Sequence, residues 1–256
     1  MKNIVLVLRM AGNDFKSRYA ASVLGILWAF VLPIITIIVF WVVFQLGFKS
    51  VPIQNVPYIL WFAAAYVPWI YFNDMLSFGV NALSDYSYLV KKVRFQVGCI
   101  PLIRIVSSML VHLFFILFLY FMFWCYGMPL SFFSMVQALY YSCALTCFTS
   151  GLVFLLSSLA VFFRDVAQLV MVILQIGFWV TPIFWNAREI EQSVLDVVRL
   201  NPLFYIIEGY REGFIYHVPF WEHPAMACYF WTVTIVIGTV GYFTFKRLRP
   251  HFADEL

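Results

Sequence analysis

Residues that could carry chemistry are few in this sequence and lie far apart. The four histidines show no zinc-binding spacing (His112, His217, His223 and His251). The chain contains neither a G-x-x-x-x-G-K-[ST] phosphate-binding loop nor a G-x-S-x-G nucleophile elbow, and its five cysteines include no C-x-x-C pair. We therefore predict no catalytic residue, no metal site and no cofactor in this chain, which should not hydrolyse ATP itself.

Two ionisable residues, His112 and Asp74, lie in or near predicted spans and could take part in proton or ion transport. His112 is interpreted as a hydrogen-bonded structural residue, with a proton relay as the alternative. Among the carboxylates, Asp74 lies near one end of a predicted span. Ion-coupled transporters usually carry carboxylates within the membrane, so this pattern argues against ion-coupled transport.

The composition is that of a membrane protein. Of 256 residues, 64% are hydrophobic and 11% charged, with a mean hydropathy of +0.92, whereas soluble domains average about 25% charged residues. Runs without charge mark the bilayer-crossing helices, and Gly127-Met128-Pro129 divides the longest run, Ile105–Phe163. We predict an all-α polytopic membrane protein, a single domain over residues 1–256. Its six transmembrane helices are predicted at 23–46, 57–78, 101–126, 135–161, 166–185 and 225–246.

The distribution of positive charge predicts the orientation. With both termini in the cytoplasm, twelve of the sixteen Lys and Arg residues lie on the cytoplasmic side. The four remaining on the outside are Lys49, Arg188, Arg199 and Arg211. No basic tract is long enough to indicate nucleic-acid binding.

Residues 1–18 are predicted to form an amphipathic helix in the membrane interface. Apolar residues recur at helical spacing (Ile4, Leu8, Ala11 and Phe15), and basic residues recur on another face (Lys2, Arg9 and Lys16). A plain anchor beside the first span and a role in gating or docking a partner both remain open.

A second segment outside the spans, residues 85–100, alternates basic and apolar side chains. Lys91, Lys92 and Arg94 interleave with Val93 and Phe95 and follow Leu89. Positive-inside charge alone would explain the basic residues. The apolar residues favour a coupling segment that inserts into a cytoplasmic partner.

The external segment 187–222 mixes acidic residues with apolar stretches. Pro182, Pro202 and Gly213 would break helices in and beside it. Backbone at membrane depth must be hydrogen-bonded within the protein or line a cavity. We predict short re-entrant helices between spans five and six, and an amphipathic loop on the outer surface is the alternative.

Aromatic residues are abundant, with 29 Phe, 15 Tyr and 9 Trp. Flat ring faces could let the C–H faces of sugar rings slide past without tight binding; lipid contact or simple packing is the alternative. The candidates for a translocation pathway lie in the first and fifth predicted spans: Trp28, Phe40, Trp41, Phe44, Phe178, Trp179 and Trp185.

Five motifs in order carry a family resemblance. The first, R-Y-x-x-S-x-L-G-x-x-W-x-x-x-x-P, runs from Arg18 to Pro33. It resembles the opening of the ABC-2 type permeases that export polysaccharides and polyol phosphates. The other motifs similar to that family are Leu89–Phe95 with Pro101, Phe163-Arg164-Asp165, Thr181–Trp185, and the pairs Asn201-Pro202 and Tyr210-Arg211. Phe95-Gln96 departs from the Phe-Pro usual in the family, so the rigid bend that a proline imposes is missing from that segment.

The resemblance implies a homodimer of six-span permeases in the bacterial inner membrane, bound to two ATPase subunits that hold ATP and Mg. The substrate would be a lipid-linked polysaccharide of the O-antigen, capsule or teichoic acid type, moving between the permeases along their first and fifth spans. Membrane lipids would surround the complex. An exporter of a drug or small lipid and a non-transporting scaffold remain alternatives.

The resemblance also implies roles for residues outside the pathway. ATPase coupling is assigned to Phe15, Leu89, Lys91, Lys92, Val93, Arg94 and Phe95. Arg18 and Tyr19 would hold a lipid phosphate or act in gating, although Arg18 as a plain topogenic arginine fits equally well. The external re-entrant gate is assigned to Pro182, Asn201, Pro202, Tyr210 and Arg211.

Overall fold

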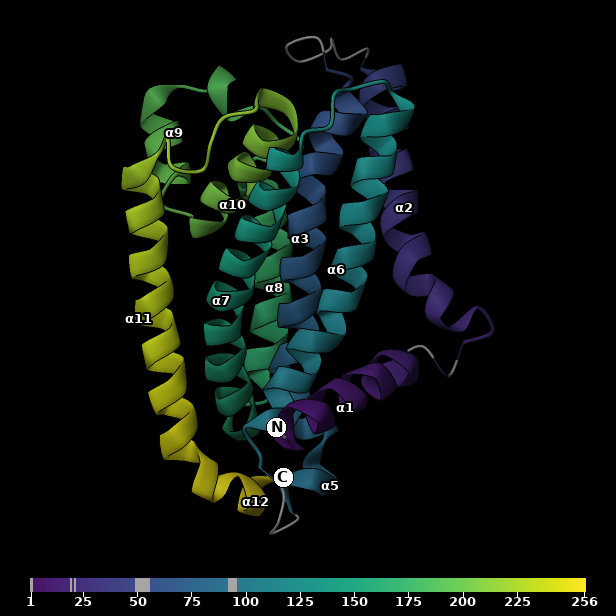
Figure 1. Ribbon diagram of the computed structural model, residues 1–256. Coiled ribbons are helices and arrows are strands. Elements are labelled where there is room, and N and C mark those ends of the chain that lie inside the picture. Colours follow the sequence, from purple (N-terminus) through teal and green to yellow (C-terminus); the bar gives the residue numbers. More distant parts are fainter. Residues whose placement is uncertain (1, 19, 21, 49–55, 92–95) are drawn as a thin grey trace.

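The protein is a bundle of long helices. A computed structural model describes residues 2–18, 20, 22–48, 56–91 and 96–256, and these residues form helices and connecting turns without a β-strand. Figure 1 shows the long helices running along one common axis, with both chain termini at the same end of the bundle. The long helices are α2 (Trp28–Trp41, continued by η2, Val42–Gly47), α3 (Tyr58–Val80), α6 (Cys99–Cys125), α7 (Phe132–Phe162), α8 (Asp165–Val180) and α11 (Pro224–Leu248).

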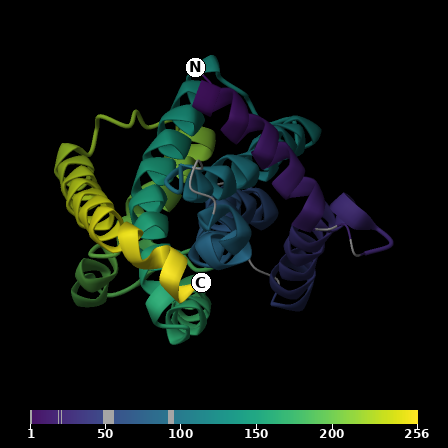
Figure 2. The ribbon, with the colours of Figure 1, turned by 90° about the horizontal axis from the view of Figure 1, so that it is seen from below.

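Helix α3 forms the centre of the bundle. Leu60, Phe62 and Ala64 are completely buried, and the helix packs against α6, α7 and α8. A helix that is apolar on all sides belongs in a protein interior. The helices α2 and α11 lie on opposite sides of this centre (Figure 2).

Four described segments are long and apolar enough to cross a membrane: Gly25–Gly47, Cys99–Cys125, Phe132–Phe162 and Pro224–Glu255. Helix α3 contains Asn73, Asp74 and several Tyr and Trp residues, which lower its hydropathy. Helix α8 has 16 residues and ends at Val180, so the last five residues of the predicted span 166–185 are not helical. Thr181 takes an extended conformation (φ −77°, ψ 138°) because the proline that follows disfavours the helical region.

Helix α1 (Lys2–Arg18) lies across the foot of the bundle and packs on α6 (Figures 1 and 2). Its buried residues are Val7, Ala11 and Asp14, whereas Ile4 and Leu8 are 66% and 56% exposed. The apolar stripe expected from the sequence is therefore divided. One part contacts protein, and the other remains available to a membrane interface.

The predicted coupling segment begins as two short helices, α4 (Ala82–Asp85) and α5 (Ser87–Val90). The C-terminal residues cover it through η5 (Arg249–His251) and α12 (Phe252–Glu255). Phe252 is fully buried and packs in one apolar cluster with Leu89 and Val90. The last residues of the chain thereby stabilise the inner side of this segment.

The segment between α8 and α11 lies at the other end of the bundle (Figure 1). It contains η3 (Ala187–Glu189), α9 (Gln192–Val198), α10 (Pro202–Arg211) and η4 (Glu212–Tyr216). Helix α10 is buried against α3 and α7 rather than lying on the surface. Asn201 caps its first turn by accepting a hydrogen bond from the Leu203 amide (3.0 Å).

Helices α7 and α11 approach closely at a contact made of glycines. A Cβ on Gly151 would lie 2.9 Å from the Cα and amide nitrogen of Gly238, and a Cβ on Gly241 would collide with the carbonyl oxygen of Gly151. Small residues at such contacts let helix backbones approach within a membrane. This contact holds the peripheral α11 to the bundle.

The variant Gly151→Ala tests the contact. The added methyl group meets backbone atoms of Gly238, which cannot rotate away, so the two helices must separate. Overpacking costs roughly 1–3 kcal/mol, and we expect a lower melting temperature of the purified protein in detergent. Gly238→Ala is the matched control, since a Cβ there meets no described atom within 4 Å. Equal melting temperatures for the two variants would contradict this packing.

Candidate functional site

An aromatic groove opens between α2, α3 and α8. Its cavity is about 480 Å³, and its lining is Thr36, Phe40, Tyr66, Trp69, Asn73, Gln168, Met171, Val172, Leu174, Gln175, Phe178 and Trp179. A second cavity of about 290 Å³ shares Phe40 and Trp179 and adds Phe44. No residue in the described lining of either cavity is charged. The groove therefore offers a ligand ring faces, amides and the hydroxyls of Thr36 and Tyr66.

The aromatic rings of the groove are held by contacts with one another and with rings of the core. Phe40 stacks on the buried Phe62 of α3 with centroids 4.6 Å apart, and its ring lies 5.9 Å from that of Phe178 on α8. Phe44 stacks on Tyr58 at 5.1 Å. Edge and offset contacts of this kind stabilise ring positions. The inner rings are thus fixed, while Trp179 is 58% exposed at the mouth.

The structure brings four of the seven predicted pathway residues together: Phe40, Phe44, Phe178 and Trp179 line the two cavities. Trp28 lies at the other end of α2, where its indole donates to the Ser22 hydroxyl (2.8 Å). Trp185 donates to the carbonyl of Trp179 (3.0 Å), and Trp41 packs half-buried against the main core. The pathway role of all seven stays a prediction.

The non-helical segment after α8 is held by side chains from three other places. Asn201 donates to the Thr181 hydroxyl (2.9 Å), and Tyr58 donates to the carbonyl of Phe184 (2.9 Å). Arg211 donates to the carbonyl of Ile183 (2.8 Å). These hydrogen bonds satisfy backbone and side-chain groups that lie beside apolar rings. The sequence motifs Thr181–Trp185, Asn201-Pro202 and Tyr210-Arg211 are therefore parts of one unit.

Arg211 is the centre of that unit. Its guanidinium is completely buried, lies 3.4 Å from the centre of the Trp61 ring and pairs with Glu208 at 2.5 Å. Of the predicted gate residues, Pro182 and Tyr210 are also buried, and Pro202 is the first residue of α10. Tyr58, Trp61 and Glu208 were missed by the sequence analysis.

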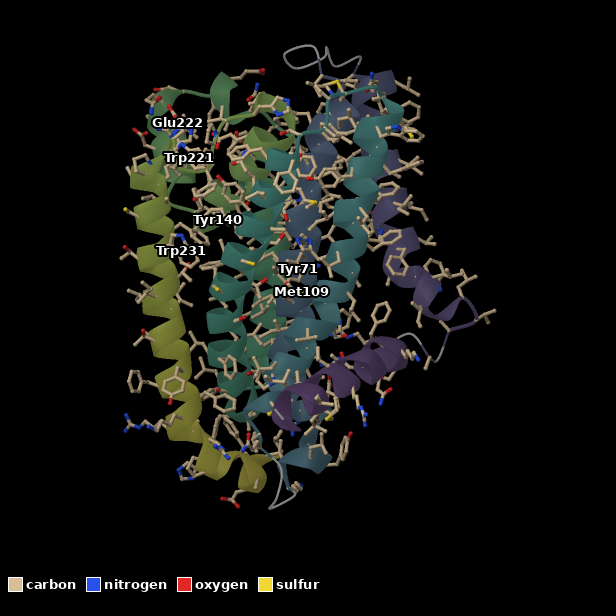
Figure 3. The ribbon with its side chains drawn as sticks, viewed as in Figure 1. Tyr71, Met109, Tyr140, Trp221, Glu222 and Trp231 are labelled. Atoms are coloured by element: carbon tan, nitrogen blue, oxygen red, sulfur yellow. The ribbon has the colours of Figure 1, made fainter. Side chains whose placement is uncertain are left out.

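A polar network lies in the middle of the bundle, near Tyr71 (Figure 3). The ring of Tyr71 stacks on His112 with centroids 4.1 Å apart. The Nε2 atom of His112 lies 2.9 Å from the Ser142 hydroxyl and 3.0 Å from the Tyr210 hydroxyl. The prediction that His112 is hydrogen-bonded is confirmed. Through this network Tyr210, the neighbour of Arg211, is connected to helices α3, α6 and α7.

At the opposite end, five charged side chains form an ion-pair cluster: Asp14, Arg18, Asp74, Asp85 and Arg104. Arg18 pairs with Asp14 (2.8 Å) and Asp74 (3.3 Å). Arg104 pairs with Asp14 (2.9 Å) and Asp85. Burial raises the pKa of Asp85, although Arg104 opposes the shift. The cluster joins α1, α3, α4 and α6. The sequence analysis had counted Arg104 only among the positive charges that set the orientation in the membrane.

The remaining predicted residues of this end are placed as follows. Arg18 also lies over the Phe78 ring (4.1 Å), so its guanidinium is surrounded by protein, and its lipid-phosphate role stays a prediction. Phe15 packs edge-on against Phe30 (6.3 Å), Leu89 is buried, and Lys91 is exposed. Tyr19, Lys92, Val93, Arg94 and Phe95 lie outside the described residues.

Comparison with known families identifies the class of this protein. The family model described as ABC-2 type transporter matches residues 6–215, so the chain belongs to that family. It is a multi-pass membrane subunit, distinct from the ATPase with which such a permease works.

Individual relatives cover nearly the whole chain. The chain is 26% identical to the O-antigen export system permease protein RfbA of Myxococcus xanthus over 98% of its own length and 95% of the relative. It is 28% identical to a protein of the same name from Klebsiella pneumoniae, with the same coverage.

The ion pair at Arg211 can be tested by a double-mutant cycle. Arg211→Leu leaves Glu208 beside an apolar space, and removing one partner of a buried pair costs roughly 3–5 kcal/mol. We expect a large drop in melting temperature in detergent, and partial recovery in the double variant with Glu208→Gln. Additive effects of the two substitutions would contradict a direct interaction.

The ion-pair cluster predicts that Asp14 holds α1 on the bundle. Asp14→Asn removes the carboxylate that two arginines share, and a hydrogen bond to a charged group contributes roughly 1.5–3 kcal/mol. Backbone hydrogen exchange over Lys2–Arg18 should accelerate about tenfold or more. Asp165→Asn, at an exposed carboxylate, is the control. Unchanged exchange in α1 would contradict the anchoring role.

Proposed function

We propose that this chain is the permease subunit of an ABC transporter that exports a lipid-linked polysaccharide, of O-antigen, capsule or teichoic acid type, across the bacterial inner membrane. A separate ATPase would bind ATP and Mg and supply the energy. The similarity over 98% of the chain to permeases named for O-antigen export is the observation that carries this proposal.

The aromatic groove is the proposed path of the polymer. Ring faces contact the C–H faces of sugars, and the amides of Asn73, Gln168 and Gln175 can exchange hydrogen bonds with hydroxyl groups. Gln168 and Gln175 are seven residues apart and therefore lie on one face of α8, where both are exposed. Many weak, uncharged contacts would let a polymer slide through the groove without being bound tightly at any one place.

A second copy of the chain would complete the path. The groove is open along α2 and α8, and apolar side chains beside it are exposed, among them Ile35, Leu169 and Ile173. Facing copies would cover these surfaces and enclose the groove. The open groove supports the homodimer, and one ATPase subunit for each permease copy completes the proposed complex.

The topology proposed for the chain has six spans and both termini in the cytoplasm. Helices α3 and α8 cross the membrane with the four more apolar segments, because α3 is surrounded by protein and needs no lipid-facing surface. Helix α1 lies in the interface, with Ile4 and Leu8 facing lipid. The gate residues Pro182, Asn201, Pro202, Tyr210 and Arg211 are then at the outer end.

The proposed ATPase contact lies at the end of the bundle that carries the termini. Exposed Lys91 and the neighbouring Lys92 and Arg94 would meet the ATPase, and Arg18 with Tyr19 would receive the lipid phosphate. The ion-pair cluster connects this region to α6 through Arg104. A movement imposed on α4 and α5 would therefore reach α1 and α6.

The export role is tested by co-expressing the chain with its ATPase and measuring polymer at the cell surface. Combined alanine substitution of Phe40, Phe178 and Trp179 should lower export about tenfold or more, since each lost ring contact contributes roughly 0.5–1.5 kcal/mol, while the ATPase still co-purifies. Phe121, Trp124 and Phe243, exposed outside the groove, are the matched alanine control. Wild-type export by the groove variant would remove the pathway assignment, and absence of a bound ATPase would remove the proposed function.

A further inference from the structure

Two adjoining cavities are lined by residues of α9, α10, α11 and neighbouring turns. Figure 1 shows α9 and α11 on the side of the bundle opposite α2. The first, of about 260 Å³, is lined by Glu208, Glu212, His223 and Arg199 among other residues. The second, of about 210 Å³, shares Arg199, Tyr205 and Met226 with the first. Together they reach the volume of a typical ligand pocket, roughly 300–1,000 Å³.

The first cavity is a polar lobe that carries both signs of charge. Glu208 and Glu212 are four residues apart and so lie on one side of the helical segment. Glu208 bonds Arg211 (2.5 Å), and Glu212 bonds His223 (2.9 Å). A carboxylate has about four acceptor positions, so each keeps capacity for a further donor. Arg199 stands at the boundary with the second cavity.

The second cavity is an apolar lobe. Besides the shared residues it is lined by Leu200, Asn201, Pro202, Ala225 and Tyr229, and the side chain of Asn201 is engaged with Thr181 and the Leu203 amide. Helix α11, which forms one wall, exposes apolar side chains along its outer face, including Ile235 and Val236. Such a surface suits lipid, so the apolar lobe lies where an acyl chain could enter from the membrane.

We propose that the two lobes bind one phospholipid with a primary ammonium headgroup, such as phosphatidylethanolamine. The ammonium donates hydrogen bonds to Glu212 and Glu208, and Arg199 contacts the phosphate. The first part of an acyl chain lies along Ala225 and Tyr229. A phosphatidylglycerol headgroup would bring no cation to the carboxylates. The quaternary ammonium of phosphatidylcholine has no hydrogen to donate.

This site goes beyond the proposed export function and does not depend on it. Its lining comes from α9, α10, α11 and neighbouring turns, whereas that of the aromatic groove comes from α2, α3 and α8. Arg211, which anchors the segment after α8, contacts Glu208 from behind the polar lobe. A bound lipid would therefore stabilise the same unit that Arg211 holds.

Native mass spectrometry of the full chain in mild detergent tests the proposal. An equal mixture of phosphatidylethanolamine, phosphatidylglycerol and phosphatidylcholine with identical acyl chains is the probe. We expect phosphatidylethanolamine to be retained about tenfold over the other two, as one charge-assisted hydrogen bond allows. Glu212→Gln should abolish this preference. Glu222→Gln, at an exposed carboxylate on the same end of the molecule (Figure 3), should leave it unchanged.

A second variant keeps the test decisive if Glu212→Gln does not fold. Ala225→Phe would fill the apolar lobe without changing charge, and retention of all bound lipid should fall severalfold. Equal retention of the three lipids by the wild type, or unchanged retention in Ala225→Phe, would overturn the proposal. Neither readout involves polymer export, so the two proposals fail separately.

Discussion

The buried guanidinium of Arg211 fixes the half of the molecule farthest from the chain termini. The backbone after Val180 is not helical and passes apolar rings, so its carbonyl groups need donors from within the protein. Arg211 reaches Ile183 and Glu208 at once while its plane covers the Trp61 ring. A lysine could not make these contacts together, because it is a compact charge without a flat face. The end of α8, the position of α10 and the top of α3 therefore depend on one side chain.

The opposite end of the bundle uses ion pairs for a different purpose. Asp14 lies between Arg18 and Arg104 and also accepts a hydrogen bond from Tyr86 (2.7 Å). These contacts join whole helices, whereas those of Arg211 hold a backbone segment. Burying charges is costly unless they are paired, so the cluster forms only when α1, α3, α4 and α6 are all in place. Under the proposed function, this makes α1 and the coupling segment a single unit that an ATPase could move.

The positions of the long helices along the chain could be predicted from the sequence, but the contacts between the helices could not. Runs without charge locate stretches that avoid water, but they do not report backbone conformation. Residues Val166–Ala187 carry no charge, and this run hid the end of α8 at Val180. Thr181 before Pro182 was the local sign of that end. The motif residues Asn201 and Arg211 each bond the segment after α8, at Thr181 and Ile183. Tyr58 bonds the carbonyl of Phe184, which lies 126 residues later in the chain, and no local pattern reveals such a contact. Likewise, Arg104 looked like a topogenic charge because Asp14 stands on another helix.

Under the proposed function, the polar side chains of the aromatic groove are what separates a pathway from ordinary packing. Exposure of a ring does not separate the two, because Trp179 at the groove mouth is exposed and so are Phe121 and Trp124 outside the groove. A lipid-facing surface would carry no amides, because an amide in hydrocarbon loses its hydrogen bonds to water. Gln168 and Gln175 are exposed on the same face of α8, beside the open groove. At membrane depth these amides require water, hydroxyl groups or a second chain opposite them. Under the proposed topology, that requirement favours a groove that faces a partner copy and a hydrated polymer over one that faces lipid.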